Sequence, residues 1–142
     1  MSSGTPDYFR TVRENYGSAD AHRDYKVVTA NDYTTLVNII GKGIIYGGYL
    51  YLQAAGTQKN CDVALYVDDE YVFGDTFERL NKYGIIEAME CSVVLGTYDE
   101  VNYIYSLIFG KGITFERQFI VKYGEAHGET PNVFTSLMYA LI

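Results

Sequence analysis

Along most of the chain from Tyr33 onward, apolar and polar residues alternate one by one. In residues 61–67 every odd-numbered position is apolar, whereas Asp62 and Tyr66 occupy even-numbered positions. This alternation is typical of an antiparallel strand that buries one face. Further strand-like runs occupy residues 36–40, 44–54, 92–97, 103–109, 113–123 and 132–142. The pattern predicts an all-β fold, an antiparallel β-sandwich of about eight strands.

A glycine-rich turn appears twice, as Gly41-Lys42-Gly43 and as Gly110-Lys111-Gly112. Each copy separates two apolar runs, so each predicts a strand–turn–strand unit. A phosphate-binding loop is excluded, because that motif has a longer spacing and leads into a helix, whereas strand residues follow both copies here. The apolar residues beyond the two turns also align, and either an old duplication or two similar turns in one sandwich explains this.

One short helix interrupts the strands, at about residues 75–83. Asp75 is a good N-cap, and Glu78, three residues later, completes a capping box. Phe77 and Leu80 share one face of this helix, so we expect them to fill an end of the sandwich.

Residues 1–30 differ from the rest and predict an N-terminal arm that is partly helical, followed by a β-sandwich domain over residues 31–142. Tyr8, Phe9 and Tyr16 fall near helical spacing, which gives the arm an apolar stripe. We expect this stripe to dock on the sandwich or on a neighbouring subunit, and the alternative is a frayed terminus.

The last predicted strand, residues 132–142, is apolar on both faces. Phe134, Met138 and Ile142 fall on one side of it, and the opposite side is apolar as well. Two arrangements explain this pattern: a central strand that is covered on both faces, or a strand whose outer face meets another chain.

Tyrosine is unusually abundant, with 15 residues among the 142. If the leucines of residues 44–54 face the core, Tyr49 and Tyr51 point outward, and Tyr66 points outward by the same argument. We expect all three on one sheet face. Their alternative roles there are cross-strand pairing that stiffens the sheet, a protein interface, or a platform for sugar rings.

The charge balance narrows the range of partners. The net charge is −7 and the pI is near 4.7, which disfavours nucleic acid and anionic membrane surfaces, because both attract positive proteins. The polar N-terminal segment has no apolar stretch of the kind found in signal peptides, and no apolar run has the length of a membrane span. We therefore expect synthesis in the cytoplasm, with Cys61 and Cys91 as reduced, buried thiols. A disulfide between them is the alternative if their strands are neighbours.

Candidate chemistry is sparse in this sequence. His22 and His127 lie in the arm and in a loop, apart from any nucleophile motif. The cysteines lack the C-x-x-C spacing of a zinc or thioredoxin site. Acidic turns at residues 68–70 and 99–100 lack the pattern of a calcium loop, so we expect solvated turn residues, with a small glycan hydrolase as the weakest alternative. We predict no catalytic residues, no cofactor, no metal and no enzymatic activity.

Residues 36–142 resemble small jelly-roll-like β-sandwich modules in virion structural proteins of tailed bacteriophages and related viruses. The resemblance lies in turn and strand patterns at residues 36–43, 47–50, 66–69, 112–116 and 139–142. It implies a jelly-roll-like fold and a role in head decoration, tail or fibre assembly, usually as a symmetric oligomer. Asp69 departs from the pattern, because such hairpins often carry Gly there, and this leaves the turn type open.

We therefore expect a non-enzymatic virion structural protein that is made in the host cytoplasm, forms a homo-oligomer and docks on a larger viral protein assembly. The candidate interface residues are Tyr8, Phe9, Tyr16, Tyr49, Tyr51, Tyr66, Phe134, Met138 and Ile142. The alternative is a carbohydrate-binding module with a tyrosine-lined face, which makes a glycan a further candidate partner.

Overall fold

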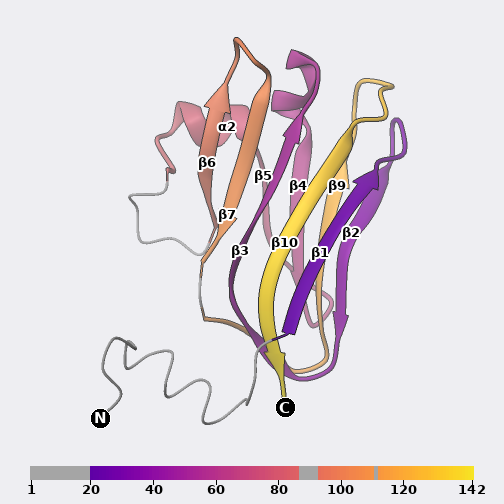
Figure 1. Ribbon diagram of the computed structural model, residues 1–142, viewed down its shortest axis with the longest axis vertical. Helices are drawn as coiled ribbons and strands as arrows, with labels where there is room; N and C mark the ends of the chain where they lie inside the picture. Colours follow the sequence, from indigo (N-terminus) through magenta and orange to yellow (C-terminus); the bar gives the residue numbers. More distant parts are fainter. Residues whose placement is uncertain (1–19, 87–92, 111) are drawn as a thin grey trace.

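The computed structural model describes residues 20–86, 93–110 and 112–142, which form two β-sheets packed face to face (Figure 1). The strands are β1 (Asp20–Val27), β2 (Tyr33–Ile40), β3 (Gly43–Gln53), β4 (Asp62–Val67), β5 (Glu70–Thr76), β6 (Val93–Asp99), β7 (Ile104–Phe109), β8 (Ile113–Phe115), β9 (Gln118–Gly124) and β10 (Asn132–Leu141). The short helices are η1 (Gly56–Asn60), which is a 3-10 helix, and α2 (Phe77–Lys82). The predicted all-β sandwich is confirmed.

The strand order is that of a jelly roll. Sheet A has the order β1-β10-β3-β7-β6, with β8 paired to the first residues of β3, and sheet B has the order β2-β9-β4-β5. These pairs are antiparallel. The pairs β1–β10, β2–β9, β3–β7 and β4–β5 nest inside one another along the chain and alternate between the two sheets, which is how a jelly roll is wound.

The hydrophobic core lies between the two sheets. Leu50 of β3, Leu107 of β7 and Val121 of β9 are buried there. In β4 the predicted alternation is confirmed, since Val63 and Leu65 face this core as well. Full burial of such a side chain contributes about 1.5–3 kcal/mol, so a core of this kind supports the sandwich without a disulfide.

A bulge interrupts the alternation of β3. Met138 pairs with Gly47 but Tyr139 pairs with Ile45, so Tyr46 is an extra residue on β3. The inward-facing positions shift by one at this point. Ile45, which strict alternation places on the outer face, is therefore fully buried in the core.

The predicted helix is present as α2, and its residues Phe77 and Leu80 are buried as expected. The predicted capping box is wrong, however, because Asp75 still belongs to β5 and pairs with Val63. Thr76 is the N-cap instead, and its side chain accepts a hydrogen bond from the backbone N–H of Arg79 at 3.1 Å. Within the described ranges, no helix has the length and apolar character needed to cross a membrane.

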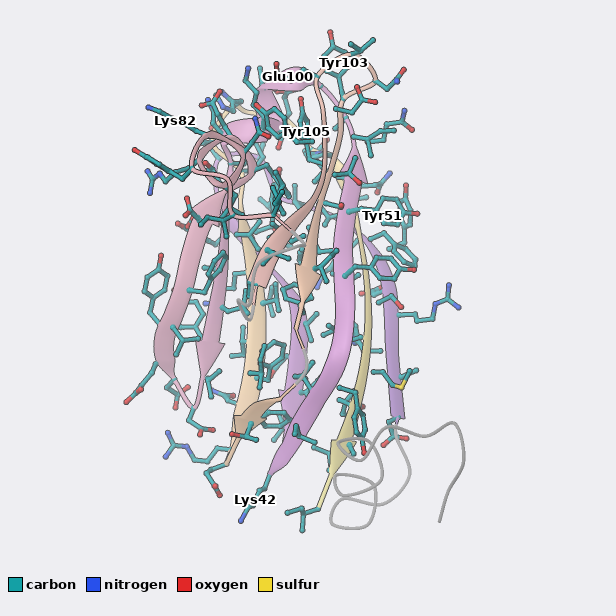
Figure 2. The ribbon with its side chains drawn as sticks, turned by 90° about the vertical axis from the view of Figure 1, so that its left-hand side faces the viewer. Lys42, Tyr51, Lys82, Glu100, Tyr103 and Tyr105 are labelled. Carbon is teal, nitrogen blue, oxygen red and sulfur yellow. The ribbon has the colours of Figure 1, made fainter. Side chains whose placement is uncertain are left out.

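The first glycine turn lies at the end of the sandwich marked by Lys42 in Figure 2 and connects β2 of sheet B to β3 of sheet A. The segment after the second glycine turn lies beside it, with Ile113 paired to Ile45. The prediction of one strand over residues 113–123 is wrong. The chain crosses from sheet A to sheet B at Glu116 and Arg117, which separates β8 from β9.

Strand β1 extends sheet A into the segment that the sequence pattern assigns to the arm. Its residues pair with β10 along the whole strand, so the sandwich reaches beyond the predicted boundary at residue 31. Charged residues such as Arg23, Asp24 and Lys26 mask the alternation expected of a strand. Such charges are common on edge strands, because they oppose pairing with a further strand. The predicted helix of the arm lies outside the described residues.

Candidate functional site

An aromatic cluster covers part of the outer face of sheet A. Phe134 of β10 lies opposite Tyr25 of β1 on one side and opposite Tyr51 of β3 on the other. Ring centroids are 5.0 Å apart for Tyr51 and Phe134, 5.8 Å for Tyr25 and Phe134, and 6.2 Å for Tyr49 and Tyr51. Tyr51 points away from the sandwich in Figure 2. We call Tyr25, Tyr49, Tyr51, Phe134 and Met138 the aromatic face.

Four residues of the aromatic face, Tyr25, Tyr49, Tyr51 and Met138, are exposed to solvent, and Phe134 is half-buried among them. Tyr25 is 60% exposed, Met138 52% and Tyr49 42%. The guanidinium of Arg23 lies 5.9 Å from the centroid of the Phe134 ring, within the range of a cation–π interaction. Contiguous exposed apolar surface of this kind is typical of an interaction site.

The position of β10 in the sheet bears on the two arrangements that explain why this strand is apolar on both faces. The strand is central in sheet A, between β1 and β3. Val133 and Leu137 on its inner side are buried in the core, whereas Phe134 and Met138 on its outer side belong to the aromatic face. The strand is therefore central, as in the first arrangement, but its outer face is partly exposed among the described residues, and contact of this face with another chain stays a prediction. Ile142 follows the strand and is exposed, although its backbone N–H donates to the carbonyl of Lys42 at 2.8 Å.

Two hollows flank Tyr49 on this face. One, of about 260 Å³, lies over Gly47 and Gly48, where β3 and β10 approach closely. A Cβ on Gly48 would come within 2.3 Å of the carbonyl oxygen of Ser136, so only glycine permits this approach. The second hollow, of about 360 Å³, lies between the tyrosines and the small residues Gly96 and Ser106 of β6 and β7.

Tyr66 does not join the aromatic face, so the prediction of three tyrosines on one sheet face is wrong. It lies on β4 in sheet B, because residues 44–54 and 61–67 belong to different sheets. The Tyr66 ring packs edge-on against its cross-strand neighbour Tyr71 at 5.6 Å, and the ammonium group of Lys122 lies 5.1 Å from its centroid. Tyr66 thus fits the cross-strand pairing role.

Sequence reasoning missed Tyr25, because the charged pattern of its strand hides that it belongs to the sheet. Its pairing with β10, which follows from the fold alone, brings the ring to Phe134. The arm residues Tyr8, Phe9 and Tyr16 lie outside the described residues.

The aspartate side chains of the acidic turns accept hydrogen bonds from nearby backbone N–H groups. The Asp68 carboxylate accepts hydrogen bonds from the backbone N–H groups of Glu116, Arg117 and Gln118, so it links the β4–β5 turn to the crossing between β8 and β9. These bonds lower the pKa of Asp68. Asp68 and Asp69 both have positive φ angles, 52° and 68°, as a type I′ hairpin turn requires, which settles the turn type.

Asp99 acts in the same way in the β6–β7 turn, where it accepts from the backbone N–H groups of Val101 and Asn102 and from the Asn102 side chain. These bonds lower the pKa of Asp99. Among residues 20–86, 93–110 and 112–142, no group of histidine, cysteine and acidic side chains has an arrangement that could hold a metal ion.

A buried carboxylate connects three loops at the opposite end from Lys42. Glu125 is 3% exposed, and its carboxylate accepts from the Gln58 side chain at 2.8 Å and from the backbone N–H groups of Asn31, His127, Gly128 and Glu129. Burial alone raises the pKa of Glu125, but these hydrogen bonds outweigh it and lower the pKa to about 2. The carboxylate is therefore a structural element that stays ionised at neutral pH.

The described cysteine, Cys61, is a free thiol buried in the core, and burial raises its pKa. A protonated, enclosed thiol is a poor nucleophile, which fits the predicted role of a core residue. Cys91 lies outside the described residues.

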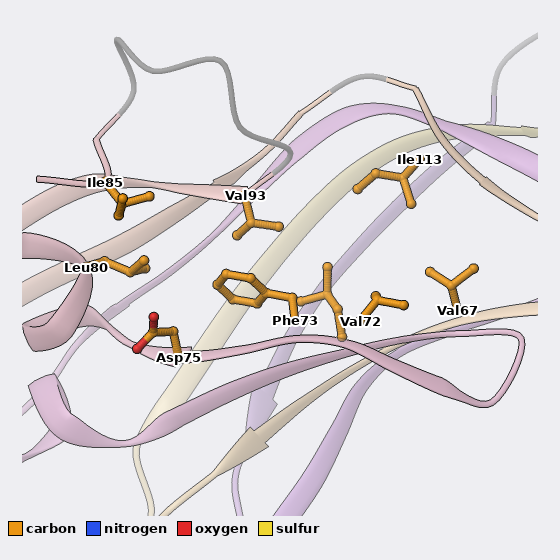
Figure 3. Close-up of a pocket in the computed structure, with 9 residues that line it drawn as sticks. Val67, Val72, Phe73, Asp75, Leu80, Ile85, Val93 and Ile113 are labelled. Atoms are coloured by element: carbon orange, nitrogen blue, oxygen red, sulfur yellow. The ribbon is translucent and has the colours of Figure 1, made fainter. Parts of the chain in front are cut away.

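An apolar opening of about 510 Å³ lies between the sheets beside β5 and β6 (Figure 3). Phe73, Leu80 and Val93 are among its lining residues, and Asp75 is the one charged residue among those drawn. Asp75 accepts from the backbone N–H of Thr76 at 2.8 Å and lies 3.4 Å from Nε of Arg79. The opening continues the hydrophobic core and places few polar groups where they would orient a ligand.

Comparison with protein-family models gives no match for this chain, and comparison with curated proteins gives no relative either. The resemblance to virion modules therefore stays a prediction.

Proposed function

We propose that this chain is a non-enzymatic structural component of a virion, such as a decoration, tail or fibre protein, and that copies of it associate through the aromatic face. The observation that carries the proposal is a cluster on one side of a well-packed sandwich, in which Tyr25, Tyr49, Tyr51 and Met138 are exposed around the half-buried Phe134. Tyrosine, phenylalanine and methionine are enriched where proteins meet, because they bury much apolar area.

A second copy of the chain suits this face better than an unrelated partner. Tyr49 and Tyr51 line a hollow of about 360 Å³ together with Gly96, Ser106 and Ile108. The ring of Phe134 lies next to that of Tyr51. The face thus carries protruding rings next to a recess, and Tyr49 and Tyr51 of β3 belong to both. If the rings of one copy enter the recess of the next, the contact is heterologous, and repeated contacts of this type close into a ring when the rotation permits.

The outer face of sheet B offers a contrast. The Tyr33 hydroxyl donates to the Asp62 carboxylate at 2.9 Å, and Lys122 covers Tyr66. Tyrosines that already pair with charged groups favour a solvated surface, so this side would face solvent or a polar surface of a larger assembly.

The acidic side chains support a structural role over hydrolysis. Asp68 and Asp99 accept hydrogen bonds from turn backbones, and Glu125 is buried and bonded to five donors. A glycan hydrolase needs one carboxyl group with a raised pKa. The shifts of these three groups are in the opposite direction.

Light scattering coupled to size-exclusion chromatography tests the proposal. We expect the wild-type chain to elute as an oligomer and the Tyr51→Glu variant as a monomer, because the substitution places a charge within the aromatic face. Tyr71→Glu is the matched control, since Tyr71 is an exposed tyrosine on sheet B, and its oligomer should persist. An oligomer that survives Tyr51→Glu, or a monomeric wild-type chain, would overturn the proposal.

A further inference from the structure

An open pocket lies at the end of the sandwich opposite Lys42, between η1, the β6–β7 turn and the β9–β10 loop. Its volume is about 480 Å³, and residues of these three segments line it together with Tyr105 of β7. Glu100, Tyr103 and Tyr105 lie together at this end of the molecule in Figure 2. None of the residues of the aromatic face takes part.

Tyr103 presents an aromatic ring at the pocket. The side chain is 45% exposed, and the backbone has φ of 57°, in the left-handed region that bulky residues rarely adopt. The turn holds this conformation, since the Tyr103 carbonyl accepts from the N–H of Ala54 at 3.1 Å. Gly56 lies under the ring, and a Cβ there would come within 3.1 Å of it. Strained residues of this kind concentrate at binding sites.

Fixed polar groups lie beside this ring. The Glu100 carboxylate accepts from Nζ of Lys59 at 2.9 Å and from the hydroxyl of Tyr98 at 2.8 Å, and Nζ of Lys59 also lies 3.4 Å from the Glu78 carboxylate. The hydrogen bond between Lys59 and Glu100 raises the pKa of the lysine and lowers that of the glutamate, so both are charged at neutral pH. The pocket therefore offers a charged donor and a charged acceptor in defined positions.

The buried hydroxyl of Tyr105 is a further feature of this pocket that indicates a ligand. The side chain is fully buried, and within the described part of the chain its hydroxyl has no hydrogen-bond partner. The ring is held in place by Phe77 at 5.7 Å and by Tyr98 at 5.3 Å. A buried polar group without a partner costs stability, and native proteins retain few of them without a reason.

We propose that this pocket binds the terminal pyranose ring of a neutral glycan. The C–H groups of a sugar pack on the negative face of an aromatic ring, and Tyr103 offers such a face. Sugar hydroxyls both donate and accept, so they suit Glu100 and Lys59 together, and one at the pocket floor would bond the Tyr105 hydroxyl. The carboxylates of Glu78 and Glu100 disfavour an acidic sugar, because like charges repel. The proposal is independent of self-association.

Saturation-transfer difference NMR on the full chain tests the site. The probes are the neutral sugars galactose, glucose, mannose, fucose, N-acetylglucosamine and N-acetylgalactosamine, with glucuronic acid and N-acetylneuraminic acid as acidic comparisons. We expect at least one neutral sugar to bind with a dissociation constant in the millimolar range and the acidic sugars to bind more weakly. Absence of binding by every neutral sugar, or stronger binding of the acidic ones, would overturn the proposal.

Variants at Tyr103 locate the binding. Tyr103→Asn removes the ring while keeping a residue that tolerates the left-handed backbone, and we expect binding at least about tenfold weaker. Tyr103→Phe keeps the ring and should bind as the wild type does. Val101→Ala is the matched control, because Val101 is exposed in the same turn but does not line the pocket. Equal sugar affinity of Tyr103→Asn and wild type would contradict the site.

Tyr105→Phe gives a second readout. Loss of the unpartnered hydroxyl should leave the melting temperature of the free protein unchanged or raise it, while the rise in melting temperature on adding sugar becomes smaller. An unchanged rise would show that the hydroxyl has no part in binding. The molar mass of each variant should equal that of the wild type, which separates this test from that of self-association.

Discussion

Tyr51 and Phe134 lie in register on the paired strands β3 and β10, with their ring centroids 5.0 Å apart on the outer face of sheet A. Phe134 also contacts Tyr25 and Tyr49, so it is the centre of the aromatic face. Central aromatic residues carry most of the binding energy of an interface.

We therefore predict that Phe134→Ala raises the dissociation constant of the oligomer by about 30-fold, or ~2 kcal/mol. Dilution experiments followed by light scattering measure this constant. Tyr71→Ala removes an exposed ring from sheet B and should leave it unchanged. Equal dissociation constants for Phe134→Ala and wild type would show that the aromatic face does not hold the oligomer together.

Gly47→Ala and Gly48→Ala should differ in stability although the residues are neighbours. Both have similar φ angles, 153° and 159°, so the strain from an added Cβ is similar. A Cβ at Gly47 meets the nearest atom at 3.6 Å, whereas one at Gly48 meets the Ser136 carbonyl at 2.3 Å. We expect Gly48→Ala to lower the free energy of unfolding by about 1–3 kcal/mol more than Gly47→Ala in urea titrations. Equal losses would argue against a close approach of β3 and β10.

Glu125→Gln should destabilise the protein at neutral pH. The pKa of Glu125 is about 2 in the folded chain, below the ordinary value for glutamate, so folding favours the ionised form. The ionised carboxylate therefore adds to the free energy of unfolding at pH values above the ordinary pKa of glutamate. This contribution is lost as the pH falls toward 2. Its full size is roughly 3 kcal/mol.

Urea unfolding of wild type and Glu125→Gln at a series of pH values measures this contribution. The difference between them should be largest above about pH 5 and should shrink at lower pH. Glu116→Gln is the control, because the Glu116 side chain is 71% exposed and a surface pair with Lys42 contributes little. A difference that does not change with pH would show that the charge of Glu125 is not what stabilises the loops.

Asp68→Asn should lower the melting temperature at pH 7. Asparagine tolerates the positive φ angle at this position, so the substitution removes the charge and leaves the turn. Because hydrogen bonds lower the pKa of Asp68, its contribution is present at neutral pH and is lost as the pH falls below the usual range of aspartate. Glu70→Gln changes an exposed carboxylate in the same hairpin and should have no such effect. An unchanged melting temperature for Asp68→Asn would rule out the role of this carboxylate as a link between turns.

Period-two alternation was enough to predict the sandwich, because burial of one face imposes it on strands such as β4. Alternation gave wrong predictions where the pairing with a neighbouring strand determines which residues of a strand face the core. The bulge at Tyr46 comes from the pairing of β3 with β10, and the break at Glu116 comes from the crossing between sheets. Both therefore depend on the pairing of the strand with segments that are distant in the sequence.

The aromatic face was predictable in part. Tyr49, Tyr51, Phe134 and Met138 follow from alternation, but their contact depends on β10 lying next to β3. The position of Tyr66 was not predictable in this way, since alternation gives the side of a strand on which a residue lies and does not tell which sheet that strand joins. The pocket around Tyr103 was out of reach, because it gathers residues from three loops whose proximity only the jelly-roll winding creates.

Sedimentation equilibrium of the wild-type chain over a wide concentration range tests the central claim most directly. Association through the aromatic face predicts a mass that rises to a whole multiple of the 16.0 kDa chain and stays there. A mass of 16.0 kDa at every concentration, up to the high micromolar range, would contradict it.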